Sequence, residues 1–229
     1  MTYQRALIVG VGPGFSASLA RRFARAGIAV TLAARRTDKL AALCAETGAT
    51  AHACDAADPA SVKNLFAALD TTGAPDLVVY NASGRVRGPI AELDPADVLS
   101  SLQVSAFGAF LVAQQAARRM LPHQHGAIVL TGATAGVKGF AMSAPFAMGK
   151  FALRGLAQSL ARELSPQGVH VVHVVIDGGI RAAHRPDPAD RPDSTLDPDA
   201  IADTTWHVLQ QHRSAWTSEI EVRPWVERF

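Results

Sequence analysis

The stretch Val9-Gly10-Val11-Gly12-Pro13-Gly14-Phe15-Ser16 decides the fold. It lies between an apolar run at residues 6–9, which has the length of a buried strand, and residues 18–26, which have the pattern of a helix. Glycines let the backbone turn sharply and approach a pyrophosphate, while the N-terminus of the following helix offers unpaired N–H groups and the positive end of its dipole. The stretch therefore predicts a phosphate-binding turn at its three glycines, the alternative being a tight turn without a ligand.

Strand-like and helix-like segments alternate along the rest of the chain. The expected strands cover residues 6–9, 29–33, 50–54, 77–80, 127–131, 169–176 and 220–222. The expected helices cover residues 18–26, 38–47, 94–121, 144–164 and 198–211, and a further helix begins at residue 58. Because strands this apolar are covered on both faces, as in a parallel sheet, the pattern predicts one α/β domain over residues 1–229. The expected fold class is a single Rossmann-like doubly wound parallel sheet of about seven strands with helices on both faces.

Residues 181–198 interrupt this alternation. They contain four prolines among aspartates and arginines, and so cannot form a regular strand or helix. A loop of this length in a compact domain is often a lid or a binding loop. The segment is therefore a candidate substrate loop, the alternative being a solvated excursion of the chain.

Composition and charge exclude several classes of protein. The net charge is +2 and there is no block of like charge, so the sequence predicts no nucleic-acid surface. No apolar run approaches the roughly 18 residues of a membrane span, and two cysteines are too few for a disulfide framework. No spacing of potential ligands suggests a metal site. We expect a cytoplasmic protein that binds a small-molecule substrate.

The end of the second expected strand indicates which dinucleotide is bound. An NAD site usually has an acidic residue there, which accepts a hydrogen bond from the ribose 2′-hydroxyl, but this sequence has Ala34-Arg35-Arg36. Arg35, together with Arg36, can bind a 2′-phosphate through paired charge-assisted hydrogen bonds. The cofactor is therefore expected to be NADP(H) in preference to NAD(H), the alternative being two solvated arginines.

With these motifs the chain resembles the short-chain dehydrogenase/reductase family, from Gly10 to the last expected strand. The family's Thr-Gly-x-x-x-Gly-x-Gly fingerprint is matched at Gly10, Gly14 and the neighbouring Phe15, with its first Thr and last Gly lost. The resemblance implies an adenine contact at Asp55 and Ala56, after the third strand. A partial Asn-Asn-Ala-Gly motif after the fourth strand implies further cofactor contacts at Asn81, Ala82 and Gly84.

The catalytic positions depart from the family pattern. The Tyr-x-x-x-Lys motif corresponds to Phe146-Ala147-Met148-Gly149-Lys150, and residues four apart share a helix face, so Lys150 is expected beside the Phe146 ring. In the family the lysine holds the nicotinamide ribose and the tyrosine exchanges the proton, which Phe146 cannot do without a hydroxyl. The family's serine corresponds to Ala133 and its asparagine to Ser105. Only Lys150 is retained, and the chain resembles an atypical subgroup with Phe in place of the tyrosine.

Other side chains are candidates for the missing proton donor. Thr134 follows the position of the lost serine, Ser143 precedes Phe146 by one helical turn, and Asp177 follows the sixth expected strand, at the sheet edge where ligands bind. Each has a structural alternative: a backbone hydrogen bond for Thr134, a helix cap for Ser143 and a turn for Asp177. Ile180 is expected to contact the cofactor through its backbone N–H.

Three functions remain open at this point. The first is an NADP(H)-dependent reductase of altered mechanism that acts on a C=O, C=C or C=N group. The second is a catalytically inactive NADP(H)-binding module, either a sensor or a partner subunit. The third, a lyase or isomerase that uses the same pocket, has no positive sign in the sequence. The resemblance also implies a homodimer or homotetramer, paired through the long helices at residues 101–119 and 146–163.

Overall fold

Parallel strands alternate with helices along the whole fold. The computed structural model describes residues 2–226. The strands are β1 (Arg5–Val9), β2 (Ala29–Ala34), β3 (Thr50–Ala53), β4 (Leu77–Tyr80), β5 (Gly126–Thr131), β6 (Val169–Ile176) and β7 (Glu219–Val222). The helices are α1 (Phe15–Arg25), α2 (Ala41–Thr47), α3 (Pro59–Asp70), α4 (Pro95–Leu102), α5 (Gly108–Met120), α6 (Ala144–Leu164) and α7 (Pro198–Leu209).

Three helices begin with the same local signal, an aspartate followed by a proline. The carboxylates of Asp58, Asp94 and Asp197 each accept a hydrogen bond from the backbone N–H two residues on, at 2.9, 2.8 and 2.8 Å. The proline between has no N–H to leave unpaired, and its fixed φ suits the first helical turn. The starts of α3, α4 and α7 therefore agree with the sequence prediction.

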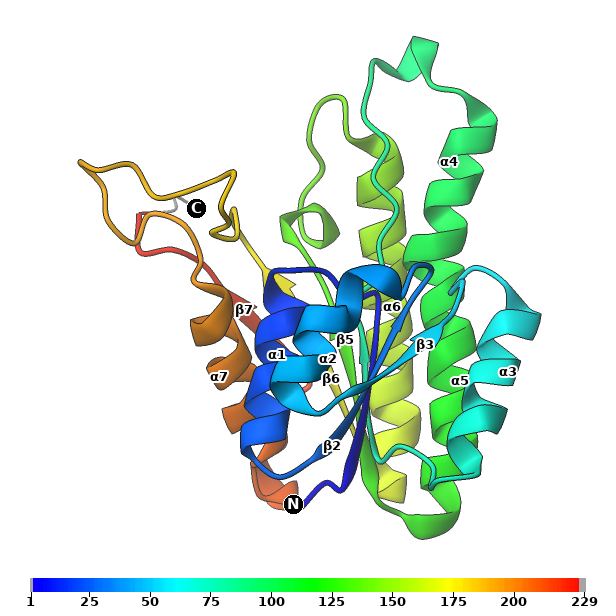
Figure 1. Ribbon diagram of the computed structural model, residues 1–229. Coiled ribbons are helices and arrows are strands. Elements are labelled where there is room, and N and C mark those ends of the chain that lie inside the picture. The colour runs from blue at the N-terminus through cyan, green and yellow to red at the C-terminus, as the bar shows by residue number, and fades with distance from the viewer. Residues whose placement is uncertain (1, 227–229) are drawn as a thin grey trace.

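All seven strands form one parallel sheet of order β3-β2-β1-β4-β5-β6-β7. Figure 1 shows α1, α2 and α7 over one face of the sheet and α3, α5 and α6 over the other. The predicted fold class is confirmed. The strand order reverses between β1 and β4, and in sheets of this kind the reversal opens a crevice at the carboxyl ends of the strands, where ligands bind.

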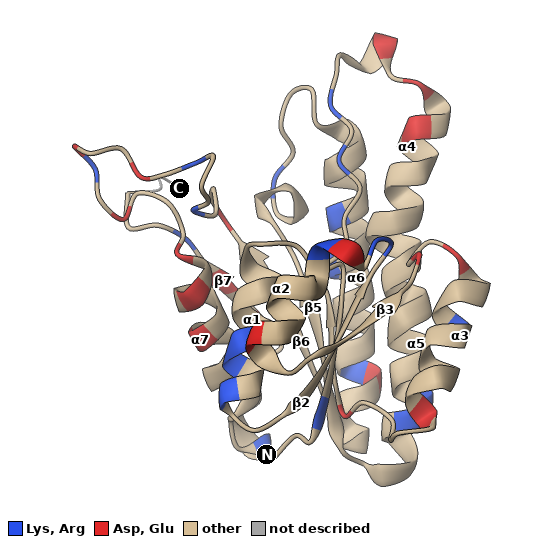
Figure 2. Cartoon of the chain, in the orientation of Figure 1, with Lys and Arg blue, Asp and Glu red and all other residues tan. Residues whose placement is uncertain are grey.

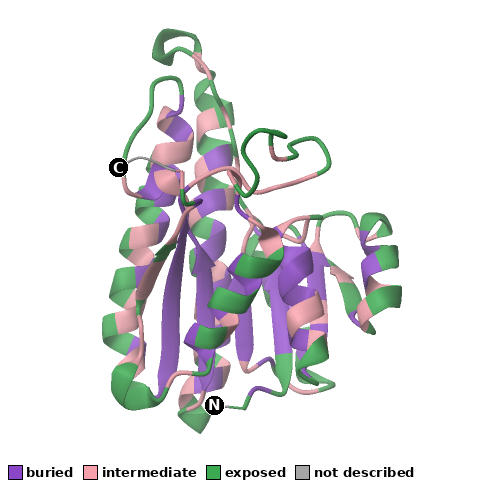
Figure 3. Cartoon of the chain, turned by 90° about the vertical axis from the view of Figure 1, so that its left-hand side faces the viewer, coloured by how far each residue is buried: buried purple, intermediate pink, exposed green. Residues whose placement is uncertain are grey.

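The sheet is buried between its two helix layers. β4, β5 and β6 are buried along their whole length, and β1 from its second residue onward. Figure 3 shows these strands as a continuous buried layer and the loops at the upper edge as largely exposed. Each fully buried apolar side chain contributes about 1.5–3 kcal/mol. The strands are therefore a stable platform, and the loops at their carboxyl ends are available for function.

Some element boundaries differ from the prediction. The helix expected over residues 94–121 contains one π-helical turn, Gln103–Phe107, between α4 and α5, and π turns often lie at functional sites. The first helix begins three residues earlier than expected, at Phe15, because Gly14 is already its N-cap. Residues 181–197 are irregular, as predicted, and form only the isolated bridges Ile180–Leu196 and Ala182–Arg185.

The helical stretch Pro95–His123 corrects the expectation about membrane spans. By length and composition alone it could cross a membrane, because its most apolar window has a mean hydropathy of 1.5. In this fold α5 packs beside α3 and α6 on one face of the sheet (Figure 1), and 33% of that window is buried. A helix that covers a sheet passes the same test of length and composition.

Candidate active site

Two adjoining cavities open at the carboxyl edge of the sheet. The first, of about 720 Å³, lies over the ends of β1, β2, β3 and β4. The second, of about 650 Å³, lies between the ends of β5 and β6, the start of α6 and the segment after β4. Asn81 lines both cavities, and its side-chain amide donates a hydrogen bond to the Gly10 carbonyl oxygen at 2.9 Å. Cavities of this size bind small molecules and cofactors.

The glycine-rich turn is one wall of the first cavity. The Ser16 hydroxyl holds it, accepting from the Gly12 N–H at 2.9 Å and donating to the Gly12 carbonyl oxygen at 3.2 Å. A Cβ on Gly12 would meet no heavy atom within 4 Å. Gly14 caps α1 without a side-chain hydrogen bond, which leaves first-turn N–H groups for an anion. The Phe15 side chain is buried in the core, so only its backbone can serve the site.

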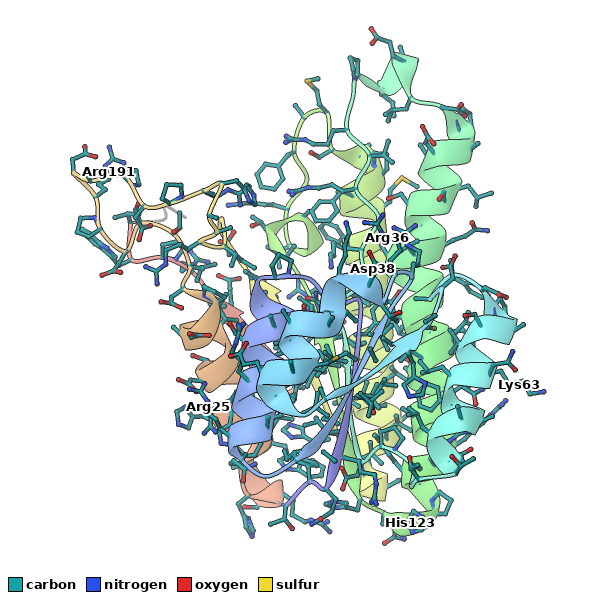
Figure 4. The ribbon with its side chains drawn as sticks, in the orientation of Figure 1. Arg25, Arg36, Asp38, Lys63, His123 and Arg191 are labelled. Carbon is teal, nitrogen blue, oxygen red and sulfur yellow. The ribbon has the colours of Figure 1, made fainter. Side chains whose placement is uncertain are left out.

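Three cations line the part of the first cavity that follows β2: Arg35, Arg36 and Lys39. Asp55 and Ala56 belong to the same lining. Figure 4 labels Arg36 and shows it above the carboxyl edge of the sheet. The sequence did not indicate Lys39, because its place at the cavity depends on the short 3-10 turn that precedes α2. The residues present fit a dinucleotide, which carries negative charge on its phosphates.

Lys150 is buried beside the second cavity. Its Nζ donates a hydrogen bond to the carbonyl oxygen of Thr131, at the end of β5, at 2.7 Å. Burial, and to a smaller extent the positive charge of Arg85, lowers the pKa of Lys150 from 10.5 to about 8. Its Nζ lies 5.9 Å from the centre of the Phe146 ring, as their spacing on one helix predicts. Two of the three ammonium protons remain for a ligand.

Two hydroxyl groups are further potential donors at the second cavity. Phe146 and Ala133, at the positions of the family's tyrosine and serine, line the cavity and offer no polar side-chain atom. Thr134 and Ser143 also line it. Ser143 is the N-cap residue of α6, yet its side chain makes no capping hydrogen bond. Both hydroxyls are therefore candidates for a hydrogen bond to a substrate.

Ser105 and Gly84 lie together outside the linings of both cavities. Ser105 is fully buried in the π turn, and its hydroxyl accepts a hydrogen bond from the Gly84 N–H at 2.9 Å. A Cβ on Gly149 would approach the Ser105 Cβ to 2.7 Å, so α6 packs closely against this serine. Ser105 thus ties the segment after β4 to the central helices and is not positioned to touch a substrate.

Asp177 also lies outside both linings. Its buried carboxylate lies 3.3 Å from the guanidinium of Arg223, and its N–H donates to the Val222 carbonyl oxygen at 2.8 Å. These contacts join the end of β6 to β7. Ile180, three residues further on, lines the second cavity, and Ala82 lines the first.

Sequence reasoning missed the role of three arginines at the second cavity. Arg85 and Arg87, in the segment after β4, and Arg185, in the segment 181–198, line it. The Cζ atom of Arg85 lies 4.8 Å from the centre of the Phe146 ring. The sequence places both loops near the pocket, but it assigns no role to an individual arginine on an irregular loop.

Comparison with known proteins agrees with this geometry. Residues 4–187 match the family model for short chain dehydrogenases. A solved short-chain dehydrogenase from Rhodopseudomonas palustris is 34% identical with a TM-score of 0.83, over 97% of this chain and 99% of that one. A metagenomic short-chain oxidoreductase, solved with NADP, is 29% identical with a TM-score of 0.84, over 96% and 97%. The cyclic-di-GMP-binding biofilm dispersal mediator protein of Escherichia coli K12 is 33% identical over 181 residues, 78% of this chain and 74% of that relative.

Fold, cavities and similarities lead to the same class. The family model spans most of the chain, and the glycine-rich turn, Asn81 and Lys150 surround the two cavities at the edge of the sheet where such proteins bind a dinucleotide. The chain belongs to the short-chain dehydrogenase family, and it is an oxidoreductase with a nicotinamide dinucleotide as its cofactor.

Proposed function

We propose that the protein is an NADP(H)-dependent reductase in which Lys150 alone remains of the catalytic tetrad, and that it reduces a C=O, C=C or C=N group. The observation that carries this proposal is Lys150 itself, a buried ammonium group at the cavity with donors to spare. A buried charge is costly unless its hydrogen bonds are satisfied. A ribose that accepts from Lys150 would satisfy them.

NADP(H) is favoured over NAD(H) by the cations at the adenosine end. Arg35 and Arg36 offer planar guanidinium groups to a 2′-phosphate, and Lys39 adds a third positive charge. The first-turn N–H groups of α1 would hold the pyrophosphate, and Lys150 the nicotinamide ribose. Asn81 and the backbone N–H of Ile180 would line the nicotinamide end. The bound cofactor supplies a hydride.

The proton has to come from a source other than Phe146. Thr134 and Ser143 can donate hydrogen bonds to the negative charge that develops on the substrate, which stabilises the transition state. Reduction would form one C–H bond with a hydride from the cofactor, and the oxygen, nitrogen or second carbon of the reduced bond would take one proton from water. A protonated imine already carries that proton and needs least help.

We propose residues 181–198 as the substrate loop within a single domain of residues 1–229. Arg181 forms ion pairs with Asp187 at 3.2 Å and with Asp193 at 3.6 Å, and it also pairs with Asp197. These contacts join the beginning of the segment to its middle and its end. Arg185, from the same segment, lines that cavity, which favours a wall of the binding site over a solvated excursion.

Calorimetric titration with NADPH and NADH tests the cofactor, and a substrate panel then tests the reaction. We expect micromolar NADPH binding and much weaker NADH binding, followed by NADPH oxidation with at least one member of a panel of ketones, enones and imines. Thr134→Val and Ser143→Ala should each lower kcat by one to two orders of magnitude with little change in NADPH affinity. Binding of neither dinucleotide would reject the proposal.

The loss of the tyrosine hydroxyl at Phe146 favours a second function, an inactive NADP(H)-binding module. One relative is itself named for binding a ligand. The double variant Phe146→Tyr, Ala133→Ser restores two groups of the family tetrad. If the natural protein binds NADPH without turnover and the double variant gains carbonyl reduction, the site is intact and its chemistry has been lost, so the module is the correct reading.

A further inference from the structure

We propose that the substrate carries a carboxylate group, bound by the guanidinium of Arg85 beside the reacting bond. This inference rests on the proposed function, because it assigns the substrate class of the same cavity. It also gives Phe146 a role: the ring that replaces the catalytic tyrosine holds the arginine that binds the substrate.

The second cavity has a marked excess of positive charge. Arg85, Arg87, Arg185 and Lys150 line it, and no aspartate or glutamate is among its described lining residues. Figure 2 shows basic and no acidic positions where the segment after β4 leaves the sheet, and acidic ones only further on, toward α4. A cavity lined by charge of one sign concentrates ligands of the opposite sign.

Arg85 lies against an aromatic ring, and its charge is not neutralised by an ion pair. Its guanidinium lies over the Phe146 ring, at 4.8 Å from the ring centre. Within residues 2–226, Arg85 and Arg87 take part in no ion pair, whereas Arg181 pairs with three aspartates. An arginine stacked on an aromatic ring keeps its N–H donors free at the edge of its plane.

The segment that carries Arg85 is hydrogen-bonded to the loop before α6. The Gly88 N–H donates to the Met142 carbonyl oxygen at 3.1 Å, which joins this segment to the loop before α6. On the opposite side, Arg185 lies close to Gly179, another lining residue. A Cβ added to Gly179 would lie 3.2 Å from Nη1 of Arg185. Basic side chains thus enter the cavity from two loops that are far apart in sequence.

The position of Arg85, close to both Phe146 and Lys150, favours a carboxylate as the group that it binds. Phe146 has Arg85 and Lys150 both within 6 Å of its ring centre, and the charge of Arg85 contributes to the lowered pKa of Lys150. A guanidinium binds a carboxylate through two parallel hydrogen bonds, which fixes orientation as well as position. A carboxylate here would also offset the repulsion between the two cations and raise the pKa of Lys150.

The test compares acids with their methyl esters. The protein, saturated with NADP⁺, is titrated calorimetrically at constant ionic strength with pyruvate, acetoacetate, 4-oxopentanoate and phenylpyruvate, and with the methyl ester of each. We expect at least one acid to bind about tenfold or more tightly than its ester. In ¹³C-lysine-labelled protein, the same acid should raise the pKa measured for Lys150.

Substitutions assign the effect to Arg85. Arg85→Gln should remove the preference for that acid, and Arg87→Gln should weaken it. Arg25→Gln changes an exposed arginine on α1, which Figure 4 shows away from the cavities, and should leave it unchanged. Equal binding of every acid and its ester, no binding of any acid, or full preference in Arg85→Gln would each overturn the inference. If the protein reduces neutral ketones but no acid, it is a reductase and the carboxylate inference is wrong. If it binds acids but reduces no member of the panel, the carboxylate inference stands and the proposed reductase function is wrong.

Discussion

NADPH differs from NADH by a single phosphate group, and the proposed preference for NADPH depends on Arg35. Arg35→Ala removes one guanidinium from the adenosine end of the first cavity. A hydrogen bond to a charged group contributes about 1.5–3 kcal/mol, so NADPH affinity should fall about 10- to 100-fold. Calorimetry of both dinucleotides measures this change.

NADH is the internal control for that substitution, because it lacks the 2′-phosphate. Its affinity should change by less than about twofold in Arg35→Ala. An equal loss for both dinucleotides would mean that Arg35 stacks on the adenine or supports the fold. The NADPH affinity of Arg36→Ala, compared with that of Arg35→Ala, would show how much each arginine contributes to binding the 2′-phosphate.

Residues of the site were predictable where a local motif marks them. Lys150 was identified from the family's Tyr-x-x-x-Lys motif, and Asn81 from the partial Asn-Asn-Ala-Gly motif after β4. The contact of Arg85 with Phe146 was not predictable, because the two residues lie 61 positions apart in the sequence. Asp177 was a candidate because it ends a strand, but its pairing with Arg223 depends on how β7 docks, which its own strand does not reveal.

In the glycine-rich turn, Gly10→Ala and Gly12→Ala can be compared to separate an effect on stability from an effect on cofactor binding. Gly10 has φ of +86°, and a Cβ there would lie 2.3 Å from the Ala82 nitrogen. Gly10→Ala should therefore lower the free energy of unfolding by about 2 kcal/mol or more, from left-handed strain and backbone overlap together. In a thermal melt this corresponds to a Tm about 4–8 °C lower.

Gly12→Ala is the control, because its new methyl group would meet no heavy atom within 4 Å. The melting temperature of the cofactor-free protein should stay within about 1 °C of the natural value. The methyl group would project where a pyrophosphate should lie, so NADPH should bind at least about tenfold more weakly. Unchanged NADPH affinity would place the pyrophosphate elsewhere.

Element boundaries were predictable to the extent that caps and breakers are local. The Asp-Pro starts and the end of α6 agree with the sequence, because each depends on a few neighbouring residues. The π turn at Gln103–Phe107 was not predicted. It lies where Ser105 meets Gly84 and α6 closely approaches, so it is associated with tertiary contacts that helical periodicity does not encode.

Because the protein buries two histidines, we expect it to lose stability in mild acid. His170 and His173 lie on β6 and are buried, and burial lowers the pKa of each below the ordinary 6.5. As the pH falls below about 6.5, the unfolded chain takes up protons that the folded protein does not. The free energy of unfolding should therefore fall from pH 7.5 to pH 5.5, as urea titrations at several pH values would show.

A histidine substitution separates this effect from other titrations. His170 stacks on Trp216, with ring centres 4.6 Å apart, and Phe can occupy that place without a proton equilibrium. His170→Phe should reduce the pH dependence of stability over this range. A slope equal to that of the natural protein would show that His170 does not contribute to it.

The helices that cover one face of the sheet expose a set of large apolar side chains. Leu99, Phe107 and Phe110 on the α4–α5 stretch, and Met148 and Phe151 on α6, are each 42–58% exposed. α4 and the π turn pack against α6, so these side chains belong to neighbouring elements. Exposed apolar surface of this kind is typical of interaction sites, and Leu99, Phe107 and Phe110 also contribute to the hydropathy of the Pro95–His123 stretch.

Pairing of two copies through these helices would bury those side chains, and light scattering tests it. The 24.1 kDa chain should have a solution mass of two or four times that value. Phe110→Asp with Phe151→Asp should shift it toward the monomer, because charges would then be buried at the interface. Trp225→Asp, at a side chain 77% exposed on the C-terminal segment, should leave the mass unchanged. If the natural protein is a monomer in solution without detergent, the pairing prediction is wrong. If it partitions into lipid vesicles through these helices, the apolar surface contacts a membrane instead.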